Sequence, residues 1–257
     1  MLLGGTDLSF ATAIDFTGSN GESSSFFAFK TKDPELKKKN AAEMYEAVVQ
    51  EIGGVLMTYD TDGRFPAFGF QGEFCFPLNG IESNPSVEGI TGMISSFRQA
   101  LANVKLKGNT HFEPVIQRAA QLASVPPTNG VFRQYIVMII LTDGKFTDQK
   151  KIVEAMATVS NLPISFVYVV VGDDPDGVNI KSFEELKNAS RQYTNRDMIQ
   201  IIQMNTLTDL SVNARSFTIA RQMIKELPTQ VVTYYAGLDI QPDNAAVKFG
   251  NISLFGM

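Results

Sequence analysis

Hydrophobic residues recur along the chain with two alternating spacings, one typical of strands and one typical of helices. Together they predict that strands and helices alternate along the sequence. Alternating apolar residues predict a strand over residues 8–14, and continuous apolar, β-branched runs at 134–141 and 164–171 are typical of strands buried on both faces. Apolar residues at helical spacing fill the intervals between strands. The predicted strands are 8–14, 65–70, 74–76, 134–141, 164–171 and 198–204, and the predicted helices are 33–59, 84–104, 112–123, 148–159 and 209–227.

Two dipeptides mark the starts of helices. Asp33-Pro34 and Asn84-Pro85 each place a capping side chain directly before a proline. Proline favours the first position of a helix, because the backbone N–H that it lacks is not needed there. We therefore expect helices to begin at these two points.

Strands that alternate with helices predict an open doubly wound α/β domain, with a mostly parallel sheet flanked by helices. We expect residues 1–236 to form this domain and residues 237–257 to form a C-terminal tail. In such sheets ligands bind at the carboxyl ends of the strands, near the switch in strand order. The loops to search for a site are therefore those after Ile14, Phe70, Leu141, Val171 and Met204.

Composition and charge exclude several classes of function. The net charge is −5 and the 22 basic residues form no large block, which argues against nucleic-acid binding. The longest apolar runs are far shorter than the ~20 residues that span a bilayer, so we expect no membrane insertion. The N-terminus has no secretory signal pattern. A single cysteine excludes an intramolecular disulfide and fits a reducing compartment, so we expect a soluble, cytoplasmic protein.

Oxygen-bearing side chains follow two of the predicted strands. The first strand ends in Asp15-Phe16-Thr17-Gly18-Ser19, and the strongest central strand ends in Thr142-Asp143-Gly144. Adjacent strands lie ~4.8 Å apart, so the two carboxylates would repel each other unless a cation lay between them. Carboxylates and hydroxyls without His or Cys suit Mg²⁺ best, with Mn²⁺ or Ca²⁺ as alternatives. A further hydroxyl precedes a helix, and the candidate metal ligands are Asp15, Thr17, Ser19, Thr110 and Asp143.

Each candidate ligand also has a simpler interpretation. Thr110 and Glu113 have the spacing of a capping box, in which the threonine hydroxyl accepts from the backbone N–H three residues on. Asp143-Gly144 is a common turn signal, and the hydroxyls after Asp15 would also stabilise a turn. We interpret His111 as a surface residue at a helix start and Cys75 as a packed side chain.

The five positions match the metal-ion-dependent adhesion site of von Willebrand factor A-type domains, with Asp15-x-Thr17-x-Ser19 in place of the commoner D-x-S-x-S. Longer stretches resemble the A domain of copines, in order along residues 4–235. They are Gly4-Gly5-Thr6, Ala13-Ile14-Asp15-Phe16-Thr17, Ser19-Asn20-Gly21, Tyr59-Asp60, Phe65-Pro66-Ala67-Phe68-Gly69-Phe70, Phe76-Pro77-Leu78-Asn79-Gly80 with Asn84-Pro85, Gly108-x-Thr110-x-Phe112-x-Pro114-Val115-Ile116, and Leu162-Pro163-Ile164-Ser165.

The sequence departs from the copine pattern in two respects. Copines carry two calcium-dependent phospholipid-binding domains ahead of this region, whereas this sequence starts at the A domain, so we expect a copine domain without them. Copines usually have Asn where this sequence has His111, beside a candidate ligand.

The resemblance to copines implies a non-enzymatic, cytoplasmic protein–protein interaction module, in which an Asp or Glu of a partner completes the shell of the metal ion. One alternative is a structural component of a larger cytoskeletal or ciliary assembly, suggested by the apolar residues in 241–257. Another is a metal-dependent phosphohydrolase, because Asp15 at a strand end resembles the nucleophile of a D-x-D motif. Thr17 takes the place of the second acid, and the sequence has neither a phosphate-binding loop nor a conventional catalytic triad.

Overall fold

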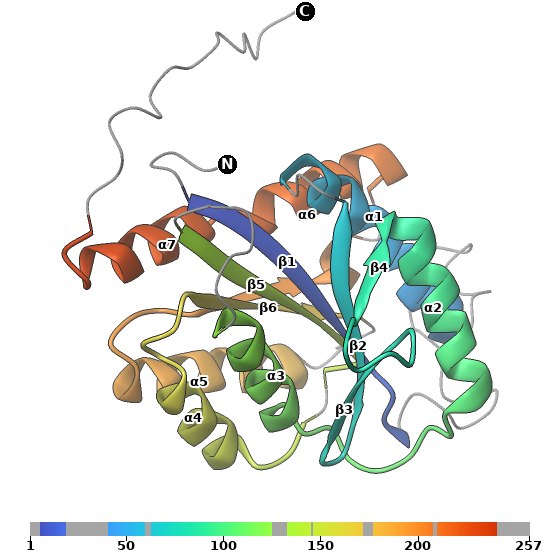
Figure 1. The fold of residues 1–257 in the computed structure, drawn as a ribbon, viewed down its shortest axis with the longest axis horizontal. Coiled ribbons are helices and arrows are strands. Elements are labelled where there is room, and N and C mark those ends of the chain that lie inside the picture. The colour runs from blue at the N-terminus through green and yellow to red at the C-terminus, as the bar shows by residue number, and fades with distance from the viewer. Residues whose placement is uncertain are drawn as a thin grey trace, which may run out of the picture.

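A seven-stranded sheet forms the middle of the molecule in the computed structural model (Figure 1). The structure describes residues 6–18, 41–59, 63–124, 133–144, 146–171, 177–207 and 210–240. Six strands follow one another in the order β3-β2-β1-β5-β6-β7, and β4 pairs with β2. Their bounds are β1 (Thr6–Asp15), β2 (Arg64–Gln71), β3 (Phe74–Pro77), β4 (Ser86–Glu88), β5 (Arg133–Thr142), β6 (Ile164–Val170) and β7 (Ile199–Gln203).

The middle of the sheet is parallel. β1 pairs in parallel with β2 on one side and β5 on the other, and β5-β6 and β6-β7 are also parallel. Among the strands that the structure describes, only β3 and β4 run antiparallel to their neighbour β2. The structure thus confirms the predicted open, mostly parallel sheet, and it confirms each predicted strand to within a few residues at the ends.

Helices cover both faces of this sheet. Alternate residues of β5 point to opposite sides, so Tyr135, Val137 and Ile139 belong to one hydrophobic core, while Ile136 and Met138 belong to the other. The first core lies under α1 (Ala41–Tyr59), α2 (Gly89–Asn103), α6 (Val212–Met223) and α7 (Leu227–Ala236), and the second under α3 (Glu113–Ala123), α4 (Gln149–Thr158) and α5 (Val178–Tyr193).

The prediction that Asn84-Pro85 opens a helix is wrong. The next residues form β4, in which Val87 pairs with Phe65, and the helix begins only at Gly89. Gly89 has a φ of 57°, a left-handed conformation that glycine adopts without strain and that separates the strand from the helix. Pairing with β2 therefore overrides the local capping signal.

Two further helical predictions need correction. The predicted helix 209–227 is two helices, because Pro228 lies in the first turn of α7 and cannot continue the ladder of a preceding helix. Helix α5 was missed altogether, although Phe183, Leu186 and Ser190 bury one face at helical spacing. The predicted start at Asp33-Pro34 lies outside the described residues.

The sheet ends at β3 in an edge with few available backbone groups. The residues of β3 whose backbone points away from β2 are Cys75 and Pro77, because Leu78 donates to Ala67 of β2 and the pattern alternates. Pro77 has no N–H, and its carbonyl accepts from Gly80. The carbonyl of Cys75 accepts from Arg118 Nη2 at 3.1 Å.

Residues 237–240, the start of the predicted tail, continue past α7 as a turn, and the rest of that tail, residues 241–257, lies outside the described residues. The boundary between residues 236 and 237 therefore stays a prediction. Among the helices described here, none combines the length and the apolar character needed to cross a membrane.

Candidate metal centre

The candidate metal centre lies where the two central strands of the sheet end. Asp15 is the last residue of β1, and Asp143 directly follows Thr142, the last residue of β5. The parallel register pairs Ile14 with Leu141, so the two strand ends lie side by side. The structure thus places both carboxylates at the carboxyl edge of the sheet, where ligands of doubly wound folds bind.

Backbone hydrogen bonds bring a third segment, the loop between α2 and α3, to the same edge. Gly18 N–H donates to the carbonyl of Gly108 at 3.2 Å, and Thr147 N–H donates to the carbonyl of Thr110 at 3.4 Å. The loop is therefore tied to the segment after β1 on one side and to the segment after β5 on the other. Thr110, which is buried, lies between them.

The carboxylate of Asp15 is the centre of the cluster. Asp15 is 2% exposed, and its Oδ1 accepts from the backbone N–H of Thr17 at 2.9 Å and from Thr17 Oγ1 at 2.6 Å. Its Oδ2 accepts from Thr110 Oγ1 at 3.4 Å, and the hydroxyls of Thr17 and Thr110 lie 3.2 Å apart. Three of the five predicted ligands thus share one hydrogen-bonded group.

The sequence analysis missed one residue of this cluster. Thr142 Oγ1 donates to Asp15 Oδ2 at 2.9 Å, a shorter distance than that of Thr110. Its position at the end of β5, next to Asp143, was a signal that could have found it. Successive residues of a strand point to opposite faces, and at a strand end either one can turn toward a neighbouring loop.

Electrostatics make the site unfavourable for two bare carboxylates. Burial, and next the charge of Asp143, raise the pKa of Asp15 to about 7, although hydrogen bonds from Thr17 and Thr142 act to lower it. Burial and the like-charged neighbour therefore both disfavour the ionised form of Asp15. A divalent cation would remove both penalties, because it stabilises the ionised form of each carboxylate.

The capping box is not formed. Helix α3 begins at Glu113 with Phe112 as its N-cap, and no side chain caps it by a hydrogen bond. The hydroxyl of Thr110 instead faces Thr17 and Asp15. Aromatic packing holds this loop, since Phe112 is fully buried and its ring lies 5.0 Å from that of Tyr168 and 5.8 Å from that of Phe70.

The histidine and the cysteine are engaged elsewhere. His111 Nδ1 lies 3.3 Å from Glu73 Oε1, an ion pair when the histidine is protonated. Cys75 lies beside Arg118, and burial raises the pKa of its thiol to about 12. Within the described ranges, no group of three or more His, Cys, Asp or Glu side chains could hold a metal ion.

A metal at this edge would therefore depend on threonine hydroxyls together with the two carboxylates. These are all hard oxygen donors, a set that fits Mg²⁺, Mn²⁺ or Ca²⁺ rather than a metal that prefers nitrogen or sulfur. Ser19 lies outside the described residues, so the structure does not test its part in the site.

The sequence of the chain matches the family model described as Copine over residues 36–243. The chain belongs to the copine family. It is 34% identical over 252 residues to Protein BONZAI 1 of Arabidopsis thaliana, a match that covers 94% of this chain and 42% of that protein. It is 31% identical over 259 residues to Copine-C of Dictyostelium discoideum, covering 94% of this chain and 45% of that protein. The chain thus spans less than half the length of these curated relatives.

Solved structures identify the fold as that of a von Willebrand factor A domain. The SpRpn10 VWA domain matches with a TM-score of 0.50 and 12% identity, over 79% of this chain and 88% of that domain. A von Willebrand factor type A structure from Catenulispora acidiphila matches with a TM-score of 0.50 and 14% identity, over 85% of this chain and 43% of that one. The von Willebrand factor A fold agrees with the predicted open, mostly parallel α/β sheet.

Proposed function

We propose that this copine chain is a metal-dependent protein–protein interaction module. A divalent cation bound at a metal-ion-dependent adhesion site would take an Asp or Glu side chain of the partner protein as one of its ligands. The observation that carries the proposal is the cluster of hard oxygen donors around the buried carboxylate of Asp15.

The proposed ligands are Asp15, Thr17, Ser19, Thr110 and Asp143. Mg²⁺ is the ion we favour, with Mn²⁺ or Ca²⁺ as alternatives, because all of these donors are carboxylates or hydroxyls. When bound, the ion would offset the repulsion between Asp15 and Asp143 and attract a further negatively charged oxygen. The two carboxylates supply the charge that holds the ion, and the hydroxyls supply neutral oxygens.

The surroundings of the site support access by a partner. Gly108 and Asn109, which precede Thr110, are exposed, and Asp143 is half-buried. Octahedral Mg²⁺ takes six ligands and usually keeps several waters, so a cation held from the protein side can exchange a water for a partner carboxylate. The partner then needs one accessible acidic side chain.

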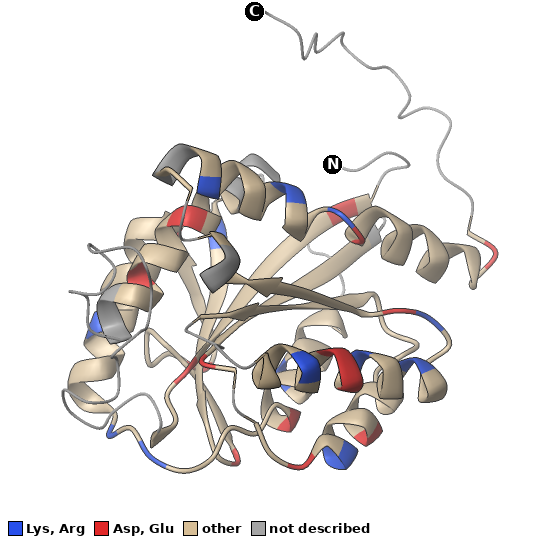
Figure 2. Cartoon of the chain, turned by 180° about the vertical axis from the view of Figure 1, so that it is seen from behind, with Lys and Arg blue, Asp and Glu red and all other residues tan. Residues whose placement is uncertain are grey.

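Non-enzymatic binding agrees with the family and with the charge distribution. The resemblance to the A domain of copines implies an interaction module, and the chain matches the Copine family model over residues 36–243. Seen from behind, the described part of the chain shows acidic and basic residues interspersed over its helices, with no basic face of the kind that binds nucleic acid (Figure 2). We also propose a cytoplasmic location, because the single cysteine suits a reducing compartment.

Two measurements test the proposal. Calorimetric titration of the purified chain with Mg²⁺ should show saturable binding that Asp15→Ala abolishes. Partner capture with the wild-type chain should then depend on Mg²⁺, stop on addition of EDTA, and fail for Asp15→Ala. Changing the contacting Asp or Glu of a captured partner to Asn or Gln should also end binding. Capture that persists in EDTA and with Asp15→Ala would contradict the proposal.

A further inference from the structure

One hydroxyl contacts both halves of the candidate metal centre. Thr142 is fully buried at the end of β5, and its Oγ1 donates to Asp15 Oδ2 at 2.9 Å. The same oxygen accepts from the backbone N–H of Gly144 at 3.3 Å. Thr142 therefore joins the end of β1 to the turn that contains Asp143.

The orientation of the Asp15 carboxylate depends on this contact. Rotation about the last torsion of an aspartate has no sharp minimum, so hydrogen bonds decide where the two oxygens point. Thr17 holds Oδ1 through its N–H and its hydroxyl. On Oδ2 the contact from Thr142 is 0.5 Å shorter than that from Thr110, which lies at 3.4 Å. Thr142 is thus the principal restraint on the second oxygen.

The second half of the contact fixes the turn around Asp143. Gly144 has a φ of 94°, which side-chain-bearing residues rarely adopt, and a Cβ at this position would lie 2.8 Å from Val170 Cγ1. Gly144 therefore holds a conformation that strongly favours glycine, and in it the backbone N–H donates to Thr142 Oγ1. Asp143 lies between the two residues that this hydrogen bond joins.

We propose that Thr142 is a positioning residue of the metal centre, one that orients Asp15 and the Asp143 turn for the cation in addition to the five proposed ligands. This inference rests on the proposed function, because it assumes that the cluster binds a divalent ion. Its consequence is a carboxylate already aligned before the ion arrives, so that binding need not order the site first.

The test is a titration of matched variants with Mg²⁺. Thr142→Val removes the hydroxyl and keeps the branched shape, and Thr142→Ser keeps the hydroxyl. Partners that orient metal ligands are typically worth about 10- to 100-fold in affinity, so we expect a loss of this size for Thr142→Val and recovery for Thr142→Ser. Thr12→Val is the control, because Thr12 is also fully buried, lies on β1, and its hydroxyl has no hydrogen-bond partner among the described residues.

The outcomes separate this inference from the function on which it rests. A wild-type chain that does not bind Mg²⁺ overturns the proposed function. Wild-type binding together with an unchanged affinity for folded Thr142→Val overturns the positioning role alone, even where the variant melts at a lower temperature. If Thr142→Val does not fold, Thr142→Ala is titrated in its place and read in the same way.

Discussion

Buried polar groups gather at both ends of the central sheet, with opposite charge. At the carboxyl end, the charged neighbour that acts on buried Asp15 is another carboxylate, Asp143. At the amino end, Arg196 is 6% exposed and donates to the carbonyls of Leu162 and Ile164, both at 2.7 Å, and to the hydroxyl of Tyr135 at 2.8 Å. Each end thus contains an ionisable group that burial alone would penalise.

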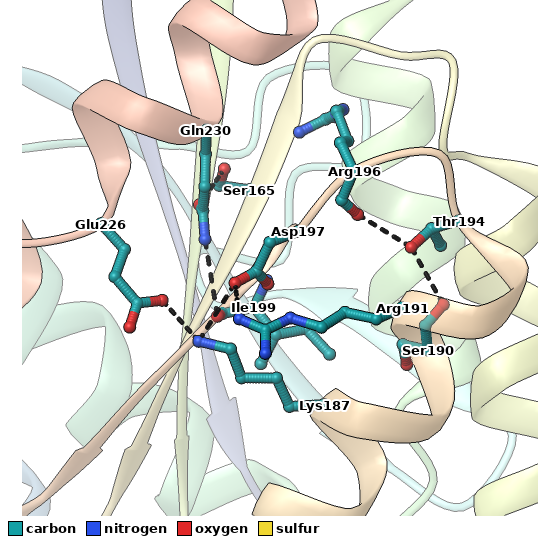
Figure 3. A network of polar contacts seen from close by, with 10 residues as sticks. All are labelled: Ser165, Lys187, Ser190, Arg191, Thr194, Arg196, Asp197, Ile199, Glu226 and Gln230. Carbon is teal, nitrogen blue, oxygen red and sulfur yellow. Dashed lines mark hydrogen bonds and ion pairs between the residues drawn. The ribbon is translucent and has the colours of Figure 1, made fainter.

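The amino end extends to the last helix. The Tyr135 hydroxyl lies 2.8 Å from Ser165 Oγ, which donates to Gln230 of α7 at 2.6 Å. Figure 3 shows Lys187 of α5 between Glu226, which precedes α7, and Asp197, which precedes β7. These contacts fasten α7 to the sheet.

The two ends of the sheet differ in whether the protein itself supplies the partners of the buried charge. The guanidinium of Arg196 finds its acceptors within the protein, so that end is a finished structural element. The carboxyl end gathers like charges and oxygen donors, an arrangement that the proposed divalent cation would balance. A buried charge that is hydrogen-bonded by the protein itself indicates a structural role. A buried charge beside a second charge of the same sign indicates a candidate functional site.

The largest effect should come from the amino end. Arg196→Ala removes the hydrogen bonds of a charged donor to the carbonyls of Leu162 and Ile164 and to the hydroxyl of Tyr135, and each such bond contributes about 1.5–3 kcal/mol. The two carbonyls each keep a second, neutral donor, the backbone N–H of Ile164 at 2.8 Å and the Tyr135 hydroxyl at 3.1 Å. We expect urea unfolding to show a loss of about 3 kcal/mol or more, while the folded variant binds Mg²⁺ as the wild type does. Weaker Mg²⁺ binding by the folded variant would show that the two ends are coupled and would break the comparison.

The next largest effect concerns the carboxyl end. Asp143→Ala removes one of the two carboxylates, and we expect Mg²⁺ affinity to fall by about 3 kcal/mol, or roughly 100-fold. Stability without metal should not fall, because Asp15 loses a like-charged neighbour. Calorimetry measures the Mg²⁺ affinity, and thermal unfolding in EDTA measures the stability without metal. Asp148→Asn is the control, since Asp148 is an exposed carboxylate paired with Lys151. Equal affinities for the two variants would exclude Asp143 as a ligand.

A smaller effect is expected for Thr110→Ala. The hydroxyl of Thr110 already lies beside Thr17 and Asp15, and it caps no helix that its loss would weaken. We expect Mg²⁺ binding to weaken about tenfold, the value of one hydrogen bond to a charged group. Binding of an acidic partner should weaken by the same factor. A loss confined to the partner titration would instead indicate that Thr110 joins the ion only when the partner arrives.

The smallest effect should come from Arg191, the exposed counterpart of Arg196. Its ion pair with Asp197 lies at the surface, where such pairs contribute about 1 kcal/mol or less. Arg191→Ala should therefore unfold in urea close to the wild type and bind Mg²⁺ normally. If Arg191→Ala and Arg196→Ala lose equal stability, the buried network is not what holds the amino end.

The fold was largely predictable because its strongest signals are local. β5 and β6 contain the apolar, β-branched runs Tyr135–Leu141 and Phe166–Val170, which are typical of strands buried on both faces of a sheet. β4 was not predictable, because its three residues are a strand only through their pairing with Arg64–Pro66. Helix α5 was missed because it is polar over most of its surface and only its buried stripe reveals it.

The residues of the candidate site also differ in how far the sequence could predict them. Asp15 and Asp143 follow strands whose ends could be located, so their meeting at one edge could be expected from topology. Thr142 was missed although it stands beside Asp143 at the end of β5. Arg196 could not be assigned, since a lone arginine carries no spacing pattern and its role depends on partners far along the chain. Arg196 contacts Tyr135, 61 residues away.

The edge of the sheet at β3, where few backbone groups are available for pairing, affects how copies of this domain can associate. An open strand edge is a template on which another chain can add its own strand, and repeated addition leads to fibrous aggregates. Here proline removes one donor, and Gly80 and Arg118 occupy the outward carbonyls. This edge of the sheet is therefore a poor template for a strand from a neighbouring copy, even where many copies are brought close together.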